Sequence, residues 1–167
     1  MNYHNITKAD MLNGDGLRVV LWVSGCNHRC DGCHNKLTWD CKSGVPFDIN
    51  AKEELFKELE KEYISGVTFS GGDPLHDNNL DDIVRLIQDI KDNYSNKTIW
   101  LYTGYTFDEI ERDPIKWYIF CSCDVVVDGR FNQELSDISY HWAGSTNQRV
   151  IDVKESLRQD KVMLWNS

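Results

Sequence analysis

The chain has 167 residues, of which 41% are apolar and 27% are charged, and its formal net charge is −9. These values predict a folded globular protein with a single domain, residues 1–167, rather than a disordered chain. The acidic balance argues against nucleic acid or an anionic membrane surface as the main partner, because both select basic surfaces.

The sequence also lacks the usual signs of export or membrane insertion. No apolar run approaches the roughly 20 residues that span a bilayer, and the first residues, Met1 to His4, have neither a basic nor an apolar stretch. We therefore expect a cytoplasmic protein. In that compartment cysteines are more often metal-binding or catalytic than disulfide-bonded, which makes the chain's six cysteines candidates for chemistry.

The first predicted strand leads directly into a cysteine loop. Arg18–Val23 is apolar after its first residue, as expected for a strand buried on both faces in a parallel sheet. Cys26, Cys30 and Cys33 follow in a C-x3-C-x2-C spacing. Three thiolates cannot fill a closed four-coordinate zinc site. An iron–sulfur cube held by three cysteines would leave one iron open for a substrate or cosubstrate, so this loop is the candidate active site.

The chain then alternates between predicted helices and strands. Helices are expected over Ala51–Tyr63, from about Asn79 to Ile90 and over Phe107–Glu111, the first with a capping box formed by Asn50 and Glu53. Strands are expected over Val67–Phe69, Thr98–Tyr102 and Asp124–Val127, with short ones at Val150–Val153 and Val162–Trp165. Such alternation is typical of α/β proteins. Because a closed barrel needs about 250 residues, we expect an open partial (β/α) barrel with a mainly parallel sheet.

Three further loops each follow a predicted strand. They are Gly71-Gly72-Asp73, Thr103-Gly104-Tyr105 and Asp128-Gly129-Arg130. Ligands of parallel sheets bind where the carboxyl ends of the strands meet. The sequence therefore predicts one composite site, formed by these loops together with the cysteine loop.

These motifs resemble a known family. The cysteine triplet followed by Gly71-Gly72-Asp73-Pro74 is similar to the two signatures of radical S-adenosylmethionine enzymes, the second of which is usually Gly-Gly-Glu. Up to about residue 150 the chain resembles one branch, the activators of anaerobic ribonucleoside-triphosphate reductase. His34 departs from this branch, which often has tyrosine there. The motifs that carry this closer resemblance are Asn13-Gly14-x-Gly16-x-Arg18, Ser24-Gly25-Cys26-x-His28, Gly32-Cys33-His34-Asn35, Thr38-Trp39, Thr103-Gly104-Tyr105, Val127-Asp128-Gly129 and Trp142-x-Gly144-Ser145-x-Asn147-Gln148.

The resemblance implies a reaction. A [4Fe–4S] cluster on Cys26, Cys30 and Cys33 would bind S-adenosylmethionine at its open iron and, once reduced, cleave it to methionine and a 5′-deoxyadenosyl radical. That radical would take a hydrogen atom from a glycine Cα of the partner, the large subunit of the reductase, and leave a glycyl radical there. The electron would come from a donor such as a flavodoxin. Cofactors carry such chemistry, and no acid–base pair is expected among the residues.

The resemblance also implies where the cosubstrate binds. The paired glycines would let the backbone approach its amine, Asp73 would accept from that amine, and Arg130 or Lys36 would hold its carboxylate. The segment from Gly32 to His34 resembles the one that contacts adenine. The expected cosubstrate-binding residues are Gly32, Cys33, His34, Gly71, Gly72, Asp73, Asp128, Gly129 and Arg130.

Other interpretations remain open at this point. The three cysteines are also compatible with a zinc-binding interaction module whose fourth ligand is His28, His34 or Cys41. A pyruvate formate-lyase activator or a deazapurine synthase would share the first two motifs. Cys121 and Cys123 are better explained as small core residues than as a redox pair. The segment Trp142–Gln148 is expected either to help dock the reductase or to be a surface turn.

Overall fold

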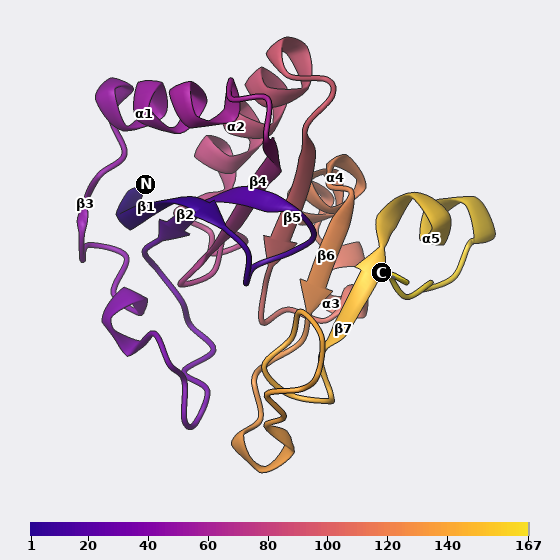
Figure 1. The fold of residues 1–167 in the computed structure, drawn as a ribbon. Helices are drawn as coiled ribbons and strands as arrows, with labels where there is room; N and C mark the ends of the chain where they lie inside the picture. Colours follow the sequence, from indigo (N-terminus) through magenta and orange to yellow (C-terminus); the bar gives the residue numbers. More distant parts are fainter. Residues whose placement is uncertain (167) are drawn as a thin grey trace.

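A seven-stranded sheet with the strand order β3-β1-β2-β4-β5-β6-β7 organises the protein, in a computed structural model that describes residues 1–166 (Figure 1). The strands are β1 (Asn2–Asp10), β2 (Leu17–Val23), β3 (Val45–Pro46), β4 (Ile64–Gly71), β5 (Thr98–Tyr102), β6 (Val125–Asp128) and β7 (Arg149–Asp152). The helices are α1 (Ile49–Leu59), α2 (Leu80–Asn93), α3 (Phe107–Glu111), α4 (Pro114–Ser122) and α5 (Val153–Gln159). Within residues 1–166 no helix is long and apolar enough to cross a membrane.

The centre of the sheet is parallel and its flanks are antiparallel. Strands β2, β4, β5 and β6 run in one direction, which confirms the predicted βαβ alternation. Strands β1 and β7 run antiparallel to their neighbours, and β3 adds a short edge next to β1. The fold is therefore mixed α/β. In Figure 1 the arrowheads of β5 and β6 point to the same end of the sheet, where the orange segment between β6 and β7 gathers.

Side chains alternate between the two faces of the sheet, and each face has its own core. On β5, Ile99 and Leu101 join the main hydrophobic core, which includes buried residues of α1, α2 and α4. Trp100 points to the other face and packs with Val125, Val127 and Val150 in a second cluster. The end of this second face at the carboxyl ends of the strands is left for the site.

A buried arginine lies at the opposite end of that second face, near the amino-terminal ends of the strands. Arg18 of β2 is fully buried and donates hydrogen bonds to the Thr68 and Thr98 hydroxyls and to the carbonyls of Asp15, Val67 and Thr98. Its guanidinium also lies over the Trp100 ring, 5.3 Å from the centroid. The buried charge is thus solvated by neutral oxygens and an aromatic face, which satisfies its donors without a carboxylate.

The cap of α1 corrects one expectation. Asp48 is the N-cap, and its carboxylate accepts from the Ala51 amide at 3.0 Å. Asn50 lies inside the helix, so the predicted capping box with Glu53 is wrong. The helix also ends at Leu59 rather than Tyr63, because β4 begins at Ile64.

The sequence patterns missed two helices, the first strand and the short β3. Pro114 lies in the first turn of α4, where Asp113 caps the helix and the missing proline N–H costs nothing. Helix α5 follows β7, and of the segment Val162–Trp165 only Leu164 forms a bridge, with Ile151. Strand β1 was not predicted, because half-exposed positions give it no clear alternation. The predicted bounds of β5 and α3 are confirmed.

Candidate functional site

The cysteine loop opens into a pocket at the carboxyl ends of the parallel strands. Its volume is about 240 Å³, and Cys26, Cys30 and Cys33 all line it. Gly71 and Gly72 come from the end of β4, and Gly129 comes from the loop after β6. The remaining lining residues are Trp22, His28, His34, Asn35, Ser70, Tyr102, Thr103, Gly104, Phe131, Gly144 and Gln148. The predicted convergence of strand-end loops on one site is therefore observed.

The three thiols differ in their surroundings. All three cysteines are free and partly exposed. Burial raises the pKa of the Cys26 thiol to about 11, although the backbone N–H groups of His28 and Arg29 oppose this by favouring the thiolate. Burial also raises the pKa of the Cys30 thiol. Metal binding requires thiolates, so loading this loop must release protons.

The side chains around the loop do not form a site for a single ion. Among residues 1–166, no three His, Cys, Asp or Glu side chains are arranged to hold one metal ion. His28 already uses both ring nitrogens, and the Cys41 sulfur accepts from the Asn78 amide. A structural zinc site needs four converging ligands, whereas each thiolate of a cube binds a different iron. The donor set therefore fits a cluster better than the zinc interpretation.

The paired glycines are fixed by close packing of backbone. A Cβ on Gly72 would lie 2.5 Å from the Gly25 carbonyl oxygen, and one on Gly71 would lie 2.5 Å from the Val23 nitrogen. The Gly72 amide donates to the Val23 carbonyl at 2.7 Å. Glycine is thus required at both positions by contact with the end of β2 and the residues after it, and both glycines still line the pocket. Their expected role at the cosubstrate amine stays a prediction.

Asp73 is buried below the pocket and does not line it. Its carboxylate accepts from the Thr103 hydroxyl and from the Gly104 and Leu75 amides at 2.8–3.0 Å, and it bonds to His28 at 2.7 Å. Every bond is to another strand-end loop or to its own turn. The expected bond to the cosubstrate amine stays a prediction, which this geometry does not favour.

The remaining predicted residues lie at different depths. Asp128 is buried, bonded to Arg149 and to the Phe107 amide, and does not line the pocket. Arg130 is exposed and reaches Glu109 at 3.0 Å and His28 at 3.2 Å. Lys36 lies over the Trp39 ring. Gly32 packs against Gln133. Neither candidate for holding a carboxylate lines the cysteine pocket, although the Arg130 guanidinium contacts His28, which does.

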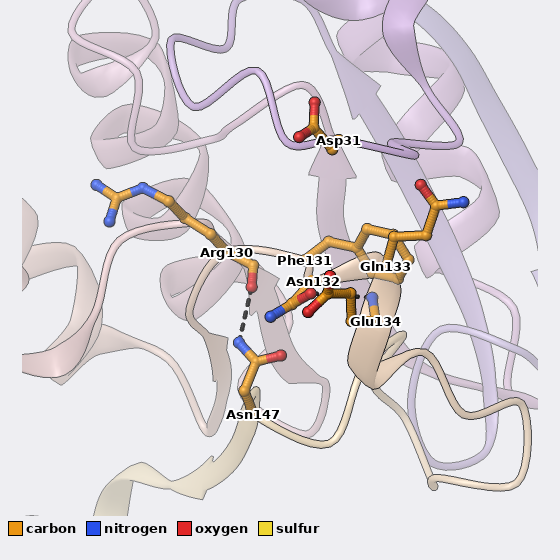
Figure 2. A pocket seen from close by; sticks show the side chains of 7 residues that line it. All are labelled: Asp31, Arg130, Phe131, Asn132, Gln133, Glu134 and Asn147. Carbon is orange, nitrogen blue, oxygen red and sulfur yellow. Dashed lines mark hydrogen bonds between the residues drawn. The ribbon is translucent and has the colours of Figure 1, made fainter.

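A larger polar pocket adjoins the first. Its volume is about 720 Å³, and Phe131 lines both pockets. Figure 2 shows the Arg130 side chain pointing away from Phe131–Glu134, while Asn147 reaches back to the Arg130 carbonyl, a bond of 2.9 Å. The full lining is Asp31, Arg130, Phe131, Asn132, Gln133, Glu134 and Asn147.

The segment Trp142–Gln148 serves partly as structure. The Gln148 amide donates to the Gly129 carbonyl, and its oxygen accepts from the Gly144 and Ser145 amides. Trp142 packs edge-on against Trp100. These contacts favour the interpretation as a packed turn for Gln148 and Trp142. Asn147 is exposed in the larger pocket, so a docking role for the segment stays a prediction.

Sequence patterns did not identify the floor of the first pocket. Trp22, Ser70 and Tyr102 are the last inward-facing residues of β2, β4 and β5. Among the residues that the structure describes, 1–166, the Tyr102 hydroxyl is enclosed without a hydrogen-bond partner, and burial raises its pKa. The available signal was the alternation of each strand, which places every second residue on one face.

Comparison with known proteins agrees with this geometry. A family model described as a 4Fe-4S single cluster domain matches residues 12–151. The anaerobic ribonucleoside-triphosphate reductase-activating protein of Enterobacteria phage T4 is 42% identical over 150 residues, which cover 90% of this chain and 93% of that protein. The proteins of the same name from Escherichia coli K12 and Pasteurella multocida are 43% and 39% identical over 152 residues, covering 90% of this chain and 97% and 96% of theirs.

The chain belongs to the family of anaerobic ribonucleoside-triphosphate reductase-activating proteins. The match to the cluster domain spans the whole pocket, from Trp22 to Gln148. The expectation that Cys26, Cys30 and Cys33 hold this cluster stays a prediction.

Proposed function

We propose that the protein is an iron–sulfur activase that reductively cleaves S-adenosylmethionine and generates a glycyl radical on the large subunit of anaerobic ribonucleoside-triphosphate reductase. The name shared by its relatives supports the target, and the cluster-domain match supports the cluster. The proposal includes a flavodoxin-like electron donor, a cytoplasmic location, a single domain and a sheet that acts as an open partial barrel.

One observation carries the proposal. Cys26, Cys30 and Cys33 line a single pocket together with Gly71 and Gly72, at the carboxyl ends of parallel strands. A cube held by three thiolates would have one iron without a protein ligand, and the rest of the pocket would offer space for a cosubstrate beside the cluster. The open position is what an iron-bound cosubstrate needs.

The residues around the pocket would have separate roles in holding the cluster and the cosubstrate. When bound, the cluster supplies the electron that breaks a carbon–sulfur bond of S-adenosylmethionine. The three thiolates hold it, and the backbone at Gly71 and Gly72 borders the space beside it. The rings of His34 and Phe131 lie 5.4 Å apart on the rim and would limit the access of water. The hydroxyl of Ser70 is a polar group of the floor that is available to orient the cosubstrate.

An anaerobic spectroscopic experiment tests the proposal. Reduced protein, S-adenosylmethionine and the reductase are mixed without oxygen, and an electron paramagnetic resonance spectrum is recorded. We expect a glycyl doublet on the reductase together with the formation of methionine and 5′-deoxyadenosine. Cleavage of the cosubstrate without a doublet, in the presence of active reductase, would assign the protein to another radical S-adenosylmethionine activity, such as a pyruvate formate-lyase activator or a deazapurine synthase.

Metal analysis distinguishes the proposed activase from a zinc-binding interaction module. Protein purified without oxygen should be brown and contain iron and sulfide. Colourless protein that contains stoichiometric zinc would instead support a non-enzymatic interaction module. The side-chain arrangement described above favours iron, because His28 is already engaged through both nitrogens.

A further inference from the structure

The His28 side chain is held on several sides although it belongs to the short loop between Cys26 and Cys30. Its Nε2 lies 2.7 Å from an Asp73 oxygen, and its Nδ1 lies 3.2 Å from Arg130 Nε. The ring packs edge-on against Tyr105 at 4.6 Å. Only 6% of the side chain is exposed. Because its side chain is held by these contacts, His28 fixes the backbone of the loop that carries the neighbouring cysteines.

Gly104 shows how closely this arrangement is built. A Cβ at Gly104 would lie 2.3 Å from the His28 ring, so any larger residue would push the imidazole away. The Gly104 amide also donates to Asp73 at 3.0 Å. The loop after β5 thus provides both the space for the imidazole and a bond to its partner.

The hydrogen bonds of His28 determine its tautomer. Arg130 Nε can only donate, so His28 Nδ1 accepts and the ring proton lies on Nε2. That proton is donated to Asp73, whose other contacts are also all donors: the Thr103 hydroxyl and the amides of Gly104 and Leu75. A carboxylate accepts on both oxygens, and here both oxygens are directed to groups of the protein itself.

We propose that Asp73 is a positioning residue that acts through His28 on the cysteine loop, and not a ligand of the cosubstrate amine. It joins the ends of three strands: the loop after β2 through His28, its own turn after β4, and the loop after β5 through Thr103 and Gly104. The proposal rests on the proposed function only in naming the cosubstrate, because the cluster itself follows from the family.

Asparagine at position 73 isolates this role. Its amide has one oxygen and one N–H₂ group, and the N–H₂ group would face donors whichever carboxylate oxygen it replaces. At Oδ2 it would face His28 and the Gly104 amide, and at Oδ1 it would face the Leu75 amide. A shift of the His28 proton to Nδ1 does not help, because Nδ1 then faces the Arg130 donor. The His28→Phe substitution keeps a ring against Tyr105 and removes both nitrogens, whereas His28→Gln introduces an amide that can still donate from a nitrogen near the position of Nε2.

The first measurement is the rate at which anaerobic holoprotein loses iron to a chelator. We expect Asp73→Asn and His28→Phe each to raise this rate about 10- to 100-fold, the usual effect of removing a group that orients metal ligands. The double variant should lose iron within about twofold of the faster single variant, because the two residues act as one unit. Asp108→Asn, an exposed carboxylate on α3, is the control and should match the parent.

The second measurement is the dissociation constant of S-adenosylmethionine, taken from the change in the spectrum of the reduced cluster. If Asp73 acts through His28, Asp73→Asn should change this constant no more than His28→Phe does. A parental rate of iron loss in Asp73→Asn, combined with cosubstrate binding weakened about tenfold or more, would overturn the proposal. So would iron-loss effects that multiply in the double variant.

A third variant covers the case in which Asp73→Asn cannot be isolated with its cluster. His28→Gln should then lose iron more slowly than His28→Phe, since its amide can still donate to Asp73. Equal rates in these two variants would reject the role of the bond. These readouts do not use the reductase, so an absent glycyl doublet in the parent would contradict the proposed function and leave this inference standing.

Discussion

At the scale of single residues, position separates the three predicted cluster ligands from the other cysteines. Cys26, Cys30 and Cys33 line one pocket, whereas Cys123 is buried in the main core and Cys121 lies on α4. Burial raises the pKa of the Cys123 thiol and keeps it protonated and inert. These placements match the expectation that Cys121 and Cys123 are core residues.

Replacing one of the three predicted cluster ligands should therefore lower the iron content far more than replacing any other cysteine. Alanine at position 26, 30 or 33 removes the thiolate of one iron, so reconstituted protein should hold little or no stable [4Fe–4S] cluster, measured as iron and sulfide per chain. Cys41→Ala, Cys121→Ala and Cys123→Ala should keep nearly parental iron. Loss of the cluster in Cys41→Ala as complete as in Cys30→Ala would mean a fourth protein ligand and no open iron.

Arg18 allows a prediction about stability. Arg18→Leu would leave two buried acceptors, the Val67 carbonyl and the Thr68 hydroxyl, without their donor. With about 1–3 kcal/mol for each unsatisfied buried group, we expect a loss of at least about 2 kcal/mol in the free energy of unfolding, measured by urea denaturation at matched cluster content. Arg18→Lys should also destabilise, because an ammonium cannot reach all of these acceptors as a planar fork does. A loss below about 1 kcal/mol for Arg18→Leu would show that water replaces the guanidinium.

A site formed by residues a few positions apart in the sequence could be predicted. Contacts between residues far apart in the sequence could not. The cysteine loop is local, and its spacing alone identified the candidate site. The partner of His28 is 45 positions away, and the acceptors of Arg18 on β4 and β5 are 49 to 80 positions away. No local pattern states whether a buried polar side chain meets a ligand or another loop. Asp73 was therefore placed in the correct loop, but its hydrogen bonds could not be foreseen.

At the scale of secondary structure, caps were harder to predict than helices. Asp48 and Asn50 are both good capping residues two positions apart, and only the tertiary position of α1 selects Asp48. Similarly, Pro114 follows Asp113, and this pair fits a helix start as well as a helix stop. The amphipathic α2, with Ile83, Ile87 and Ile90 all buried, could be predicted from its spacing.

The cap of α1 can be tested by two matched substitutions. Asp48→Ala should lower the Tm by about 2–4 °C, because the Ala51 amide loses its acceptor. Asn50→Ala should leave the Tm nearly unchanged. The bond from the Ala51 amide also lowers the pKa of Asp48. The difference between Asp48→Ala and the parent should thus be full at neutral pH and fade as the pH falls below the usual aspartate value of about 4, through the lower folded-state pKa. Equal losses of Tm in the two variants would show that Asn50 contributes as much to the cap as Asp48.

At the scale of the whole molecule, the two pockets form a continuous face. They share Phe131, and the larger one is lined by Asp31 of the cysteine loop and by the segment after β6. The lining is rich in amide and carboxylate groups, which suit the backbone of an extended polypeptide. A glycine of the reductase must come close to the cluster pocket, so its loop should pass over the larger pocket beside it.

Glu134 offers a clean probe of this approach. Its side chain is exposed in the larger pocket, and within residues 1–166 its carboxylate forms no hydrogen bond or ion pair. Glu134→Arg reverses the charge and extends into the pocket, so we expect the yield of glycyl radical at limiting activator to fall about tenfold, equivalent to about 1.4 kcal/mol of binding. The iron content and the uncoupled cleavage of S-adenosylmethionine by dithionite should stay parental. The control is Glu53→Arg, the same change on the exposed side of α1. Equal radical yields from the two variants would place the reductase on another face of the protein.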